Sequence, residues 1–183
     1  MMDYQNRKNE ANRILYEFGL LNILQKFGNP HIVGSYRMDL MTWNDLDIDV
    51  EYDNMSLEKL HELTDFVLHV FHPTWYEAKE EQHSAGESVW FHGFETMITG
   101  ELWNVDIWFF SKSEIEEAER FCDKVQRCIS QNPNCKKAIL DIKTALQKEN
   151  LYGCHAFSSM DVYRAVLEEN ILTPQAFLQK YQG

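Results

Sequence analysis

The sequence predicts a mixed α/β (α+β) fold, with a β-sheet and flanking helices in the N-terminal part and helices alone in the C-terminal part. Segments rich in β-branched and aromatic residues, some alternating in the period-two pattern of a strand, all lie within the first 110 residues. From residue 113 onward the chain shows helix-capping residues and prolines at helix starts instead. We therefore expect a core domain at residues 1–112 and a helical region at residues 113–183.

A long helix is expected over residues 3–27, and Gly28 stands where its C-terminal cap belongs. The apolar positions that recur at helical spacing are Ile14, Phe18, Leu21 and Leu24. Asn29 and Pro30 then break the helix. Residues 31–34 (HIVG) are typical of a short buried strand, and a short helix is expected directly after Gly34.

A second strand is expected over residues 46–52 (LDIDVEY), where apolar and acidic residues alternate strictly. Ser56 is a suitable N-cap for a helix that runs to about Phe71. A third strand is predicted at residues 74–80 (TWYEAKE). Residues 88–98 and 102–110 should pair as an antiparallel hairpin that turns at Gly100 and Glu101.

The C-terminal region is predicted to contain several helices joined by short breaks. Ser113 and Glu116 form a capping box ahead of a long helix, and Pro133 separates it from a second helix around residues 135–149. A loop at 151–159 follows. The residues expected to open the last two helices are Ser158 with Asp161, and Thr173 with Pro174.

Composition limits the partners that we expect. The net charge of −12 would repel a long polyanion, so nucleic acid is not expected and a small molecule, a metal-bound nucleotide or a protein is favoured. No stretch of about 18 apolar residues predicts a membrane span, and the N-terminus lacks a signal-peptide pattern. The four cysteines fit neither a zinc site nor a disulfide framework and should be free thiols in a cytoplasmic protein.

Three carboxylates on the second predicted strand point the same way: Asp45, Asp47 and Asp49. Neighbouring members lie roughly 6.5–7 Å apart along the strand. Where such groups converge to about 4 Å, they repel each other by roughly 4 kcal/mol at an effective dielectric constant of 20. Three alternatives follow: the carboxylates face open water, take up protons, or bind a hard cation such as Mg²⁺.

Two further features favour the cation. A strand followed by Gly34 and Ser35 at the start of a helix presents backbone N–H groups and a hydroxyl, which suit an anion. Asp106 lies within an aromatic, apolar strand, where a carboxylate is costly unless it is paired or metal-bound. A structural salt bridge is the alternative for Asp106. Together these parts would hold a polyphosphate and a divalent metal side by side.

This order of parts resembles the nucleotidyltransferase superfamily, whose pattern is Gly-Ser, then Asp-x-Asp, then a later acid on a strand. The matching stretches are GSYRMDLMTWNDLDIDV (34–50) and LWNVDIWFF (102–110). The ending SSMDVYRAVLEENILTPQAF (158–177) is similar to that of small bacterial members with a helical tail. The resemblance implies a nucleotidyltransferase-like mixed sheet and a helical C-terminal part.

The resemblance also implies an activity, the transfer of a nucleoside monophosphate from a nucleoside triphosphate such as ATP to a hydroxyl, with Mg²⁺ or Mn²⁺. Asp45, Asp47 and Asp106 would be the catalytic and metal-binding residues, and Gly34 and Ser35 would contact the triphosphate. Arg37 could contact phosphate, or it could pair with Asp39 or with the acidic strand.

Some assignments stay open at this level. Asp47 and Asp49 also form an Asp-x-Asp pair, and Met38-Asp39 stands where many members carry a glycine. The general base could be any of four acids: Glu77, Glu80, Glu95 or Glu101. The acceptor is expected to be a small molecule or a protein. The competing hypothesis is a non-catalytic nucleotide- or metal-binding module of the same fold.

Overall fold

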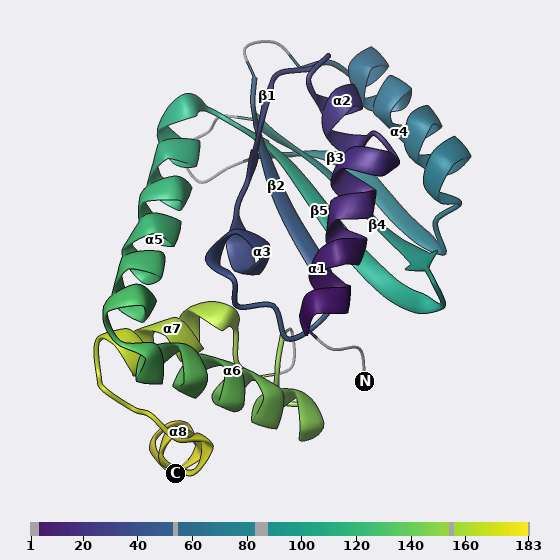
Figure 1. Cartoon of the computed structure of the whole chain (residues 1–183). Coiled ribbons are helices and arrows are strands. Elements are labelled where there is room, and N and C mark those ends of the chain that lie inside the picture. The colour runs from purple at the N-terminus through teal and green to yellow at the C-terminus, as the bar shows by residue number, and fades with distance from the viewer. Residues whose placement is uncertain (1–3, 53–54, 83–87, 154–155, 183) are drawn as a thin grey trace. The chain divides into compact units, whose positions relative to one another are not determined.

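The computed structural model describes residues 4–52, 55–82, 88–153 and 156–182 (Figure 1). The chain divides into two compact units. The sheet unit comprises Met1–Arg37 and Trp43–Arg120, and the helical unit comprises Met38–Thr42 and Phe121–Gly183. The predicted mixed sheet with flanking helices is confirmed.

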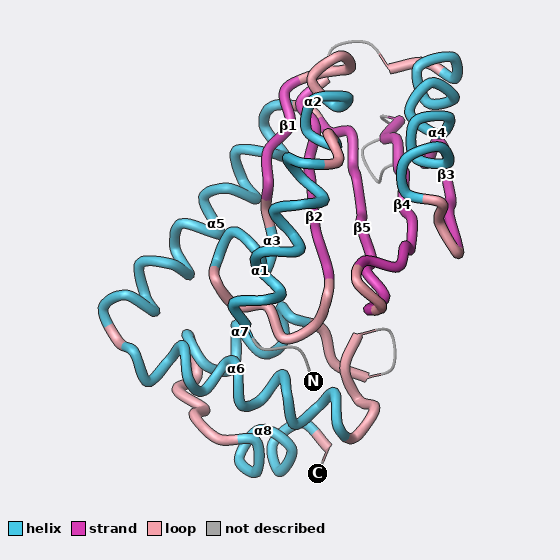
Figure 2. Tube along the Cα trace, turned by 45° about the vertical axis from the view of Figure 1, so that its right-hand side comes forward, coloured by secondary structure: helices cyan, strands magenta, loops and turns pink. Residues whose placement is uncertain are grey.

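The sheet has five strands in the order β1-β2-β5-β4-β3 (Figure 2). Only the pairing of β2 with β5 is parallel; the other three pairings are antiparallel. The strand bounds are β1 Asn29–Ile32, β2 Asp45–Glu51, β3 Trp75–Gln82, β4 Ser88–Ile98 and β5 Glu101–Phe110. The two strands that carry the predicted site, β2 and β5, are therefore direct neighbours.

One face of the sheet, the inner face, is covered by helices of the sheet unit (Figure 1). Its central residues are fully buried: Leu46, Ile48, Val50, Trp103, Val105, Ile107 and Phe109. Helix α1 (Tyr4–Asn12) reaches this face through Glu10, which accepts a 3.1 Å hydrogen bond from Trp103 Nε1. Helix α4 (Leu57–Phe71) packs Phe71 on Phe94 of β4, with ring centroids 4.9 Å apart. The apolar half of each alternating strand thus forms the core.

The opposite face, the open face, carries the polar half of β2 and β5. Register places residues of neighbouring strands in rows across this face, since directly paired residues point to the same side. One row contains Asp47, Asp106, Gly93 and Glu77, and the next contains Asp45, Asn104, Glu95 and Trp75. The strict alternation of residues 46–52 in the sequence corresponds to this division into two faces.

The predicted helix over residues 3–27 is wrong in one respect, because it is interrupted. Helix α1 is followed by a π-helical turn at Arg13–Glu17, in which Phe18 N–H donates to Arg13 C=O at 2.8 Å. Gly19 then adopts a left-handed conformation (φ +80°), and α2 starts again at Leu20–Leu24. A residue in that conformation ends the regular helix, and glycine adopts it at least cost.

The first strand and the hairpin turn are each shifted from their predicted positions. Strand β1 ends at Ile32, because Gly34 already opens the short helix α3 (Gly34–Met38) with a φ of +62°. Pro30 is tolerated in β1 because β1 is an edge strand. The β4–β5 turn residues are Thr99 (φ +48°) and Gly100 (φ +87°), a pair of positive φ values that suits a two-residue hairpin turn.

Four helices follow the sheet. They are α5 (Lys112–Gln131), whose first part belongs to the sheet unit, α6 (Pro133–Lys148), α7 (Ser159–Leu167) and α8 (Pro174–Tyr181). Ser158 and Asp161 form the predicted capping box of α7, and Thr173 caps α8. The predicted box of α5 is wrong by two residues: Glu114, not Glu116, accepts the backbone N–H of the residue ahead of the helix, Ser111, at 3.0 Å.

The predicted loop at 151–159 contains an isolated bridge between Tyr152 and Phe157. Cys122, Cys128 and Cys135 are free thiols, as predicted, and Cys154 lies outside the described residues. Among the described residues, no helix has both the length and the apolar character that a membrane span requires.

Candidate functional site

Three carboxylates from two adjacent parallel strands meet on the open face of the sheet. Asp47 of β2 lies directly opposite Asp106 of β5, and Asp45 lies opposite Asn104. Each of Asp45, Asp47 and Asp106 offers a carboxylate oxygen, and these oxygens all lie within 4.8 Å of one another. All three residues are half-buried. The structure thus brings together the three residues for which the sequence predicts a metal-binding role.

The donor set suits a hard divalent cation. Carboxylate oxygens bind Mg²⁺ at about 2.0–2.1 Å and larger cations at up to about 2.6 Å, so oxygens on one ion lie within about 5 Å of each other. The 4.8 Å limit of this group meets that condition. Asn104 Nδ2 donates to Asp45 Oδ1 at 2.9 Å, which orients that carboxylate.

Asp49 stands apart from this group. It is 6% exposed, it lies opposite His31 of β1, and it is not among the three clustered acids. Burial, and next the charge of Asp47, raise the pKa of the Asp49 carboxyl to about 7, against the opposing effect of His31. Burial also raises the pKa of Asp106, opposed by a hydrogen bond from Asn104. This geometry supports Asp45 with Asp47 as the metal pair.

The turn at Gly34 and Ser35 lies against the acidic group. A Cβ built on Gly34 would lie 2.7 Å from the Asp47 carboxyl carbon, a distance that real Cβ contacts do not reach, and its φ of +62° also favours glycine. The Ser35 side chain is buried, and its hydroxyl has no hydrogen-bond partner. A buried hydroxyl without a partner is costly, so a ligand oxygen at this point would satisfy it.

Arg37 forms an ion pair that the sequence did not predict. Its Nη1 donates to Glu119 Oε1 of α5 at 2.7 Å, and the same oxygen lies 3.1 Å from His31 Nδ1. Hydrogen bonds from His31 and Arg37 lower the pKa of Glu119. Asp39 forms an ion pair with Lys136. A phosphate contact by Arg37 therefore stays a prediction.

The four candidate bases lie on different faces of the sheet. Glu95 lies opposite Asn104, and Glu77 lies opposite Gly93, on the same side of the sheet as the three acids. Glu80 lies opposite Trp90 and Glu101 opposite Ile98, so both point to the other side. The sequence could not rank these acids because it does not give the order of the strands.

Sequence reasoning missed two residues beside the acids. Asn104 orients Asp45 through the hydrogen bond described above. Gly93 lets the Phe91 ring and the Asp106 carboxylate lie close to the backbone of β4, since a Cβ there would lie 2.9 Å from Phe91 Cε1 and 3.1 Å from Asp106 Oδ1. Asn104 precedes Asp106 by two positions on an alternating strand, and this spacing was the available signal.

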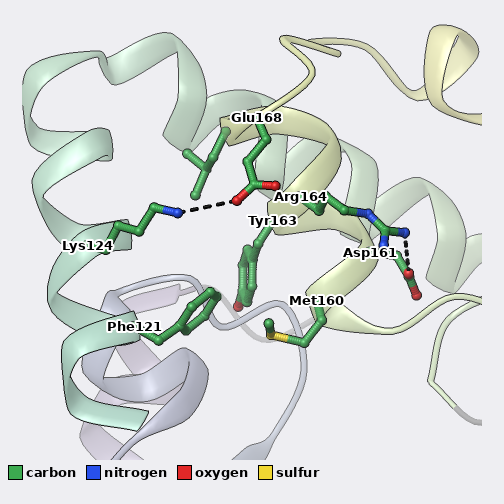
Figure 3. A pocket seen from close by; sticks show the side chains of 8 residues that line it. Phe121, Lys124, Met160, Asp161, Tyr163, Arg164 and Glu168 are labelled. Atoms are coloured by element: carbon green, nitrogen blue, oxygen red, sulfur yellow. Dashed lines mark hydrogen bonds and ion pairs between the residues drawn. The ribbon is translucent and has the colours of Figure 1, made fainter. Parts of the chain in front are cut away.

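A small pocket lies in the helical unit and contains none of the predicted site residues (Figure 3). Its volume is about 230 Å³, and α5 and α7 line it with Phe121, Tyr163 and Met160 among other side chains. Its charged groups already pair with each other: Lys124 with Glu168 at 3.2 Å and Arg164 with Asp161 at 3.1 Å. The pocket is smaller than most ligand sites, and its charges are already neutralised in pairs.

No protein-family model and no curated protein sequence matches the chain. Solved structures do match it. The poly(A) polymerase complex GLD-2–GLD-3 matches with a TM-score of 0.61 and 14% identity over 100% of this chain and 59% of the other. A cytoplasmic RNA terminal U-transferase matches with a TM-score of 0.59 and 16% identity over 88% of this chain and 47% of the other.

A third match is the Cid1 poly(U) polymerase with Mg and 3′-dATP bound, with a TM-score of 0.54 and 15% identity over 81% of this chain and 43% of the other. The chain thus spans about half of the length of the structures that it matches. These proteins are nucleotidyltransferases, and at this level of identity the likeness concerns the fold. The predicted nucleotidyltransferase-like fold is confirmed.

Proposed function

We propose that the chain is a metal-dependent nucleotidyltransferase that transfers a nucleoside monophosphate from a nucleoside triphosphate to a hydroxyl of a small molecule or a protein. The observation that carries this proposal is the group formed by Asp45, Asp47 and Asp106, whose ligand atoms lie within 4.8 Å of one another on the open face of a nucleotidyltransferase-like sheet. Gly34 stands directly beside Asp47 of that group, and the next residue, Ser35, has a buried hydroxyl without a hydrogen-bond partner.

Each residue has a role that its position supports. The three acids would hold Mg²⁺ or Mn²⁺, which when bound would neutralise charge on the phosphate oxygens. Gly34 lets the backbone of the turn lie directly against the Asp47 carboxylate, and the Ser35 hydroxyl would donate to a phosphate oxygen. Glu77 and Glu95 share the open face with the acids and are candidates to accept the proton of the acceptor hydroxyl.

The acceptor is proposed from charge. The structural neighbours act on RNA, as their names state. This chain carries a net charge of −12, which opposes the approach of an RNA end, so a small molecule or a protein in the cytoplasm is the favoured acceptor. Transfer of label to RNA in the test below would contradict this choice of acceptor.

The test is incubation of the protein with each α-³²P-labelled nucleoside triphosphate, Mg²⁺ and a cell extract, followed by separation of labelled protein, small molecules and RNA. We expect label on protein or on a small molecule, and a loss of at least about 100-fold in Asp47→Asn and Asp106→Asn, because electrostatic stabilisation is usually the largest catalytic contribution. Asp65→Asn is the control, since its side chain is 80% exposed on α4. Absence of transfer from every triphosphate would contradict the proposal.

The second candidate is a non-catalytic nucleotide- or metal-binding module. This candidate is favoured by the ion pair between Arg37 and Glu119. Arg37 lies close in sequence to the Gly-Ser turn, and its charge is used by Glu119 rather than by a phosphate. Calorimetric titration with ATP and GTP, with and without Mg²⁺, separates the two candidates when it is combined with the transfer assay. Metal-dependent nucleotide binding without any transfer would favour the module.

A further inference from the structure

Five of the residues between the Gly-Ser turn and the acidic strand β2 belong to the helical unit. Met38–Thr42 groups with Phe121–Gly183, although the residues before and after this segment belong to the sheet unit. Met38, Leu40 and Met41 are only 2%, 0% and 2% exposed. A connecting segment normally runs over the surface with its backbone in water. This one is buried, so its backbone needs partners within the protein.

Lys143 of α6 provides one such partner. Its side chain is 0% exposed, and its Nζ donates to the Leu40 carbonyl oxygen at 3.0 Å. The Nζ also lies 5.6 Å from the ring centroids of both Tyr152 and Tyr163, within the range of a cation–π interaction. Burying an ammonium group is costly unless such contacts compensate for lost water. An apolar residue would fill the same space without that cost, which suggests that the Leu40 contact is the reason for a lysine here.

Two more side chains of α6 hold the same segment. Lys136 forms an ion pair with Asp39, whose backbone has a φ of +62°, and Gln147 Nε2 donates to Thr42 Oγ1 at 3.0 Å. Positions 136, 143 and 147 are seven and four residues apart, so they lie on one face of the helix. This face of α6 contacts three of the five segment residues: Asp39, Leu40 and Thr42.

We propose that Lys143 is a positioning residue for the nucleotide and metal site, acting through residues 38–42. Met38 follows Ser35 by three positions, and Thr42 precedes Asp45 by three positions. The segment that Lys143 holds therefore lies three residues after the Gly-Ser turn and three residues before the first acid of the metal group. Fixing the Leu40 carbonyl limits how far these two ends can move. The claim that residues 38–42 position a nucleotide and metal site rests on the proposed function. The claim that Lys143 anchors residues 38–42 rests on the contacts alone.

The experiment compares the full-length protein with Lys143→Met, which keeps the length of the side chain and removes the donor and the charge. Hydrogen–deuterium exchange over residues 33–47 and Mn²⁺ affinity by electron paramagnetic resonance are measured well below the melting temperature. We expect exchange at least about tenfold faster in 33–47 and about tenfold weaker Mn²⁺ binding, the lower end of the loss expected when a supporting partner of a metal ligand is removed. Lys143→Arg, which keeps a donor and the charge, should restore part of both.

The matched control is Phe177→Leu, in a fully buried residue of α8 whose ring packs on Phe157 and Tyr181. It should lower the melting temperature without changing exchange over 33–47 or Mn²⁺ affinity. If Lys143→Met does not fold, Gln147→Leu removes another tie and is judged by the same measurements. Unchanged exchange in a folded variant, or an equal change in the control, would overturn the proposal. If wild type binds no Mn²⁺, the proposed function fails, while the exchange comparison still decides the anchoring.

Discussion

At the scale of single residues, Asp39 occupies the region where the nucleotidyltransferase resemblance leads us to expect a glycine. Its φ of +62° is the left-handed conformation that glycine adopts most easily, and among other residues Asp and Asn tolerate it best. The backbone therefore keeps a glycine-like shape although the side chain is different. The ion pair with Lys136 gives this side chain a role that glycine could not have.

Asp39→Gly and Asp39→Ala form a test of this interpretation. We expect Asp39→Ala to lower the free energy of unfolding by about 1–2 kcal/mol, because alanine is strained at this φ. Asp39→Gly should stay within about 1 kcal/mol of wild type, since it relieves the backbone and loses only a partly exposed ion pair. Chemical denaturation of the three proteins measures the difference. Equal losses in both variants would show that the side chain, and not the backbone, determines the stability here.

His92 is the buried titratable group of the inner face. It is 0% exposed, its Nε2 lies 3.2 Å from Thr64 Oγ1 of α4, and burial lowers the pKa of its imidazole to about 4. The folded protein thus keeps His92 neutral, while the unfolded chain protonates it near its ordinary pKa of 6.5. The contribution of His92 to the free energy of unfolding is therefore complete above pH 6.5 and is lost as the pH falls towards 4.

We predict a loss of about 2–3 kcal/mol in the free energy of unfolding between pH 7.5 and pH 4.5 from His92 alone. His92→Gln should show a pH dependence smaller by about that amount. His69→Gln is the control, because His69 lies on α4 with an 80% exposed side chain. Urea denaturation at the two pH values measures the effect. A variant that keeps the full wild-type pH dependence would contradict the assignment to His92.

The residues of the candidate site could be predicted from the sequence only in part. Alternation fixed that Asp45, Asp47 and Asp49 share a face, but two Asp-x-Asp pairs fitted the pattern equally well. The distinction depends on the folded structure, in which Asp45, and not Asp49, groups with Asp47 and Asp106. Gly93 lay beyond prediction for the same reason, and the two-residue spacing from Asp106 was the one available signal for Asn104. Their roles follow from which strand lies beside which.

At the scale of elements, the helix starts show what local sequence can and cannot fix. Two Ser-x-x-acid patterns overlap at the start of α5, Ser111 with Glu114 and Ser113 with Glu116. The structure uses the first, because Phe110 ends β5 and the helix begins at once at Lys112. No such overlap exists at Ser158 and Asp161, and there the predicted box of α7 is the observed one.

The two α5 patterns make a matched pair of variants. Glu114→Ala should lower the free energy of unfolding by about 1 kcal/mol, because it removes the acceptor for the Ser111 N–H and hydroxyl. Glu116→Ala removes an exposed residue with only a 4.0 Å contact to Arg120, and should change it by no more than about 0.5 kcal/mol. Thermal or urea unfolding measures both. The reverse order would show that the box observed at Ser111 does not stabilise the helix.

The N-terminal helix illustrates the opposite limit. Apolar spacing predicted that residues 3–27 are helical, and most of them are, but periodicity could not locate the break at Gly19. An isolated glycine is tolerated inside a helix, so its presence alone does not end one. Here Phe18 packs edge-on against Phe71 of α4, with ring centroids 5.9 Å apart. Packing against the second helix fixes where the chain turns.

At the scale of the whole molecule, the sequence predicted a Gly-Ser turn, an Asp-x-Asp strand and a later acid in that order, and the structure shows to which unit each belongs. The sheet unit carries the acids and the Gly-Ser turn, and the helical unit carries the segment between them. Composition and periodicity could not reveal that residues 38–42 belong to the helical unit, because in the sequence they look like any short connection. The burial of Lys143 and its bond to Leu40 reveal it.

The central claim is that the three clustered acids form a divalent-metal site, and direct Mn²⁺ titration tests it. Binding is measured by electron paramagnetic resonance at pH 8, above the pKa of about 7 that burial gives Asp49. We predict saturable binding by wild type and by the control Asp65→Asn, binding at least about tenfold weaker in Asp47→Asn and Asp106→Asn, and a change of less than about threefold in Asp49→Asn. Wild-type affinity in Asp47→Asn, or no saturable binding by wild type, would contradict the claim.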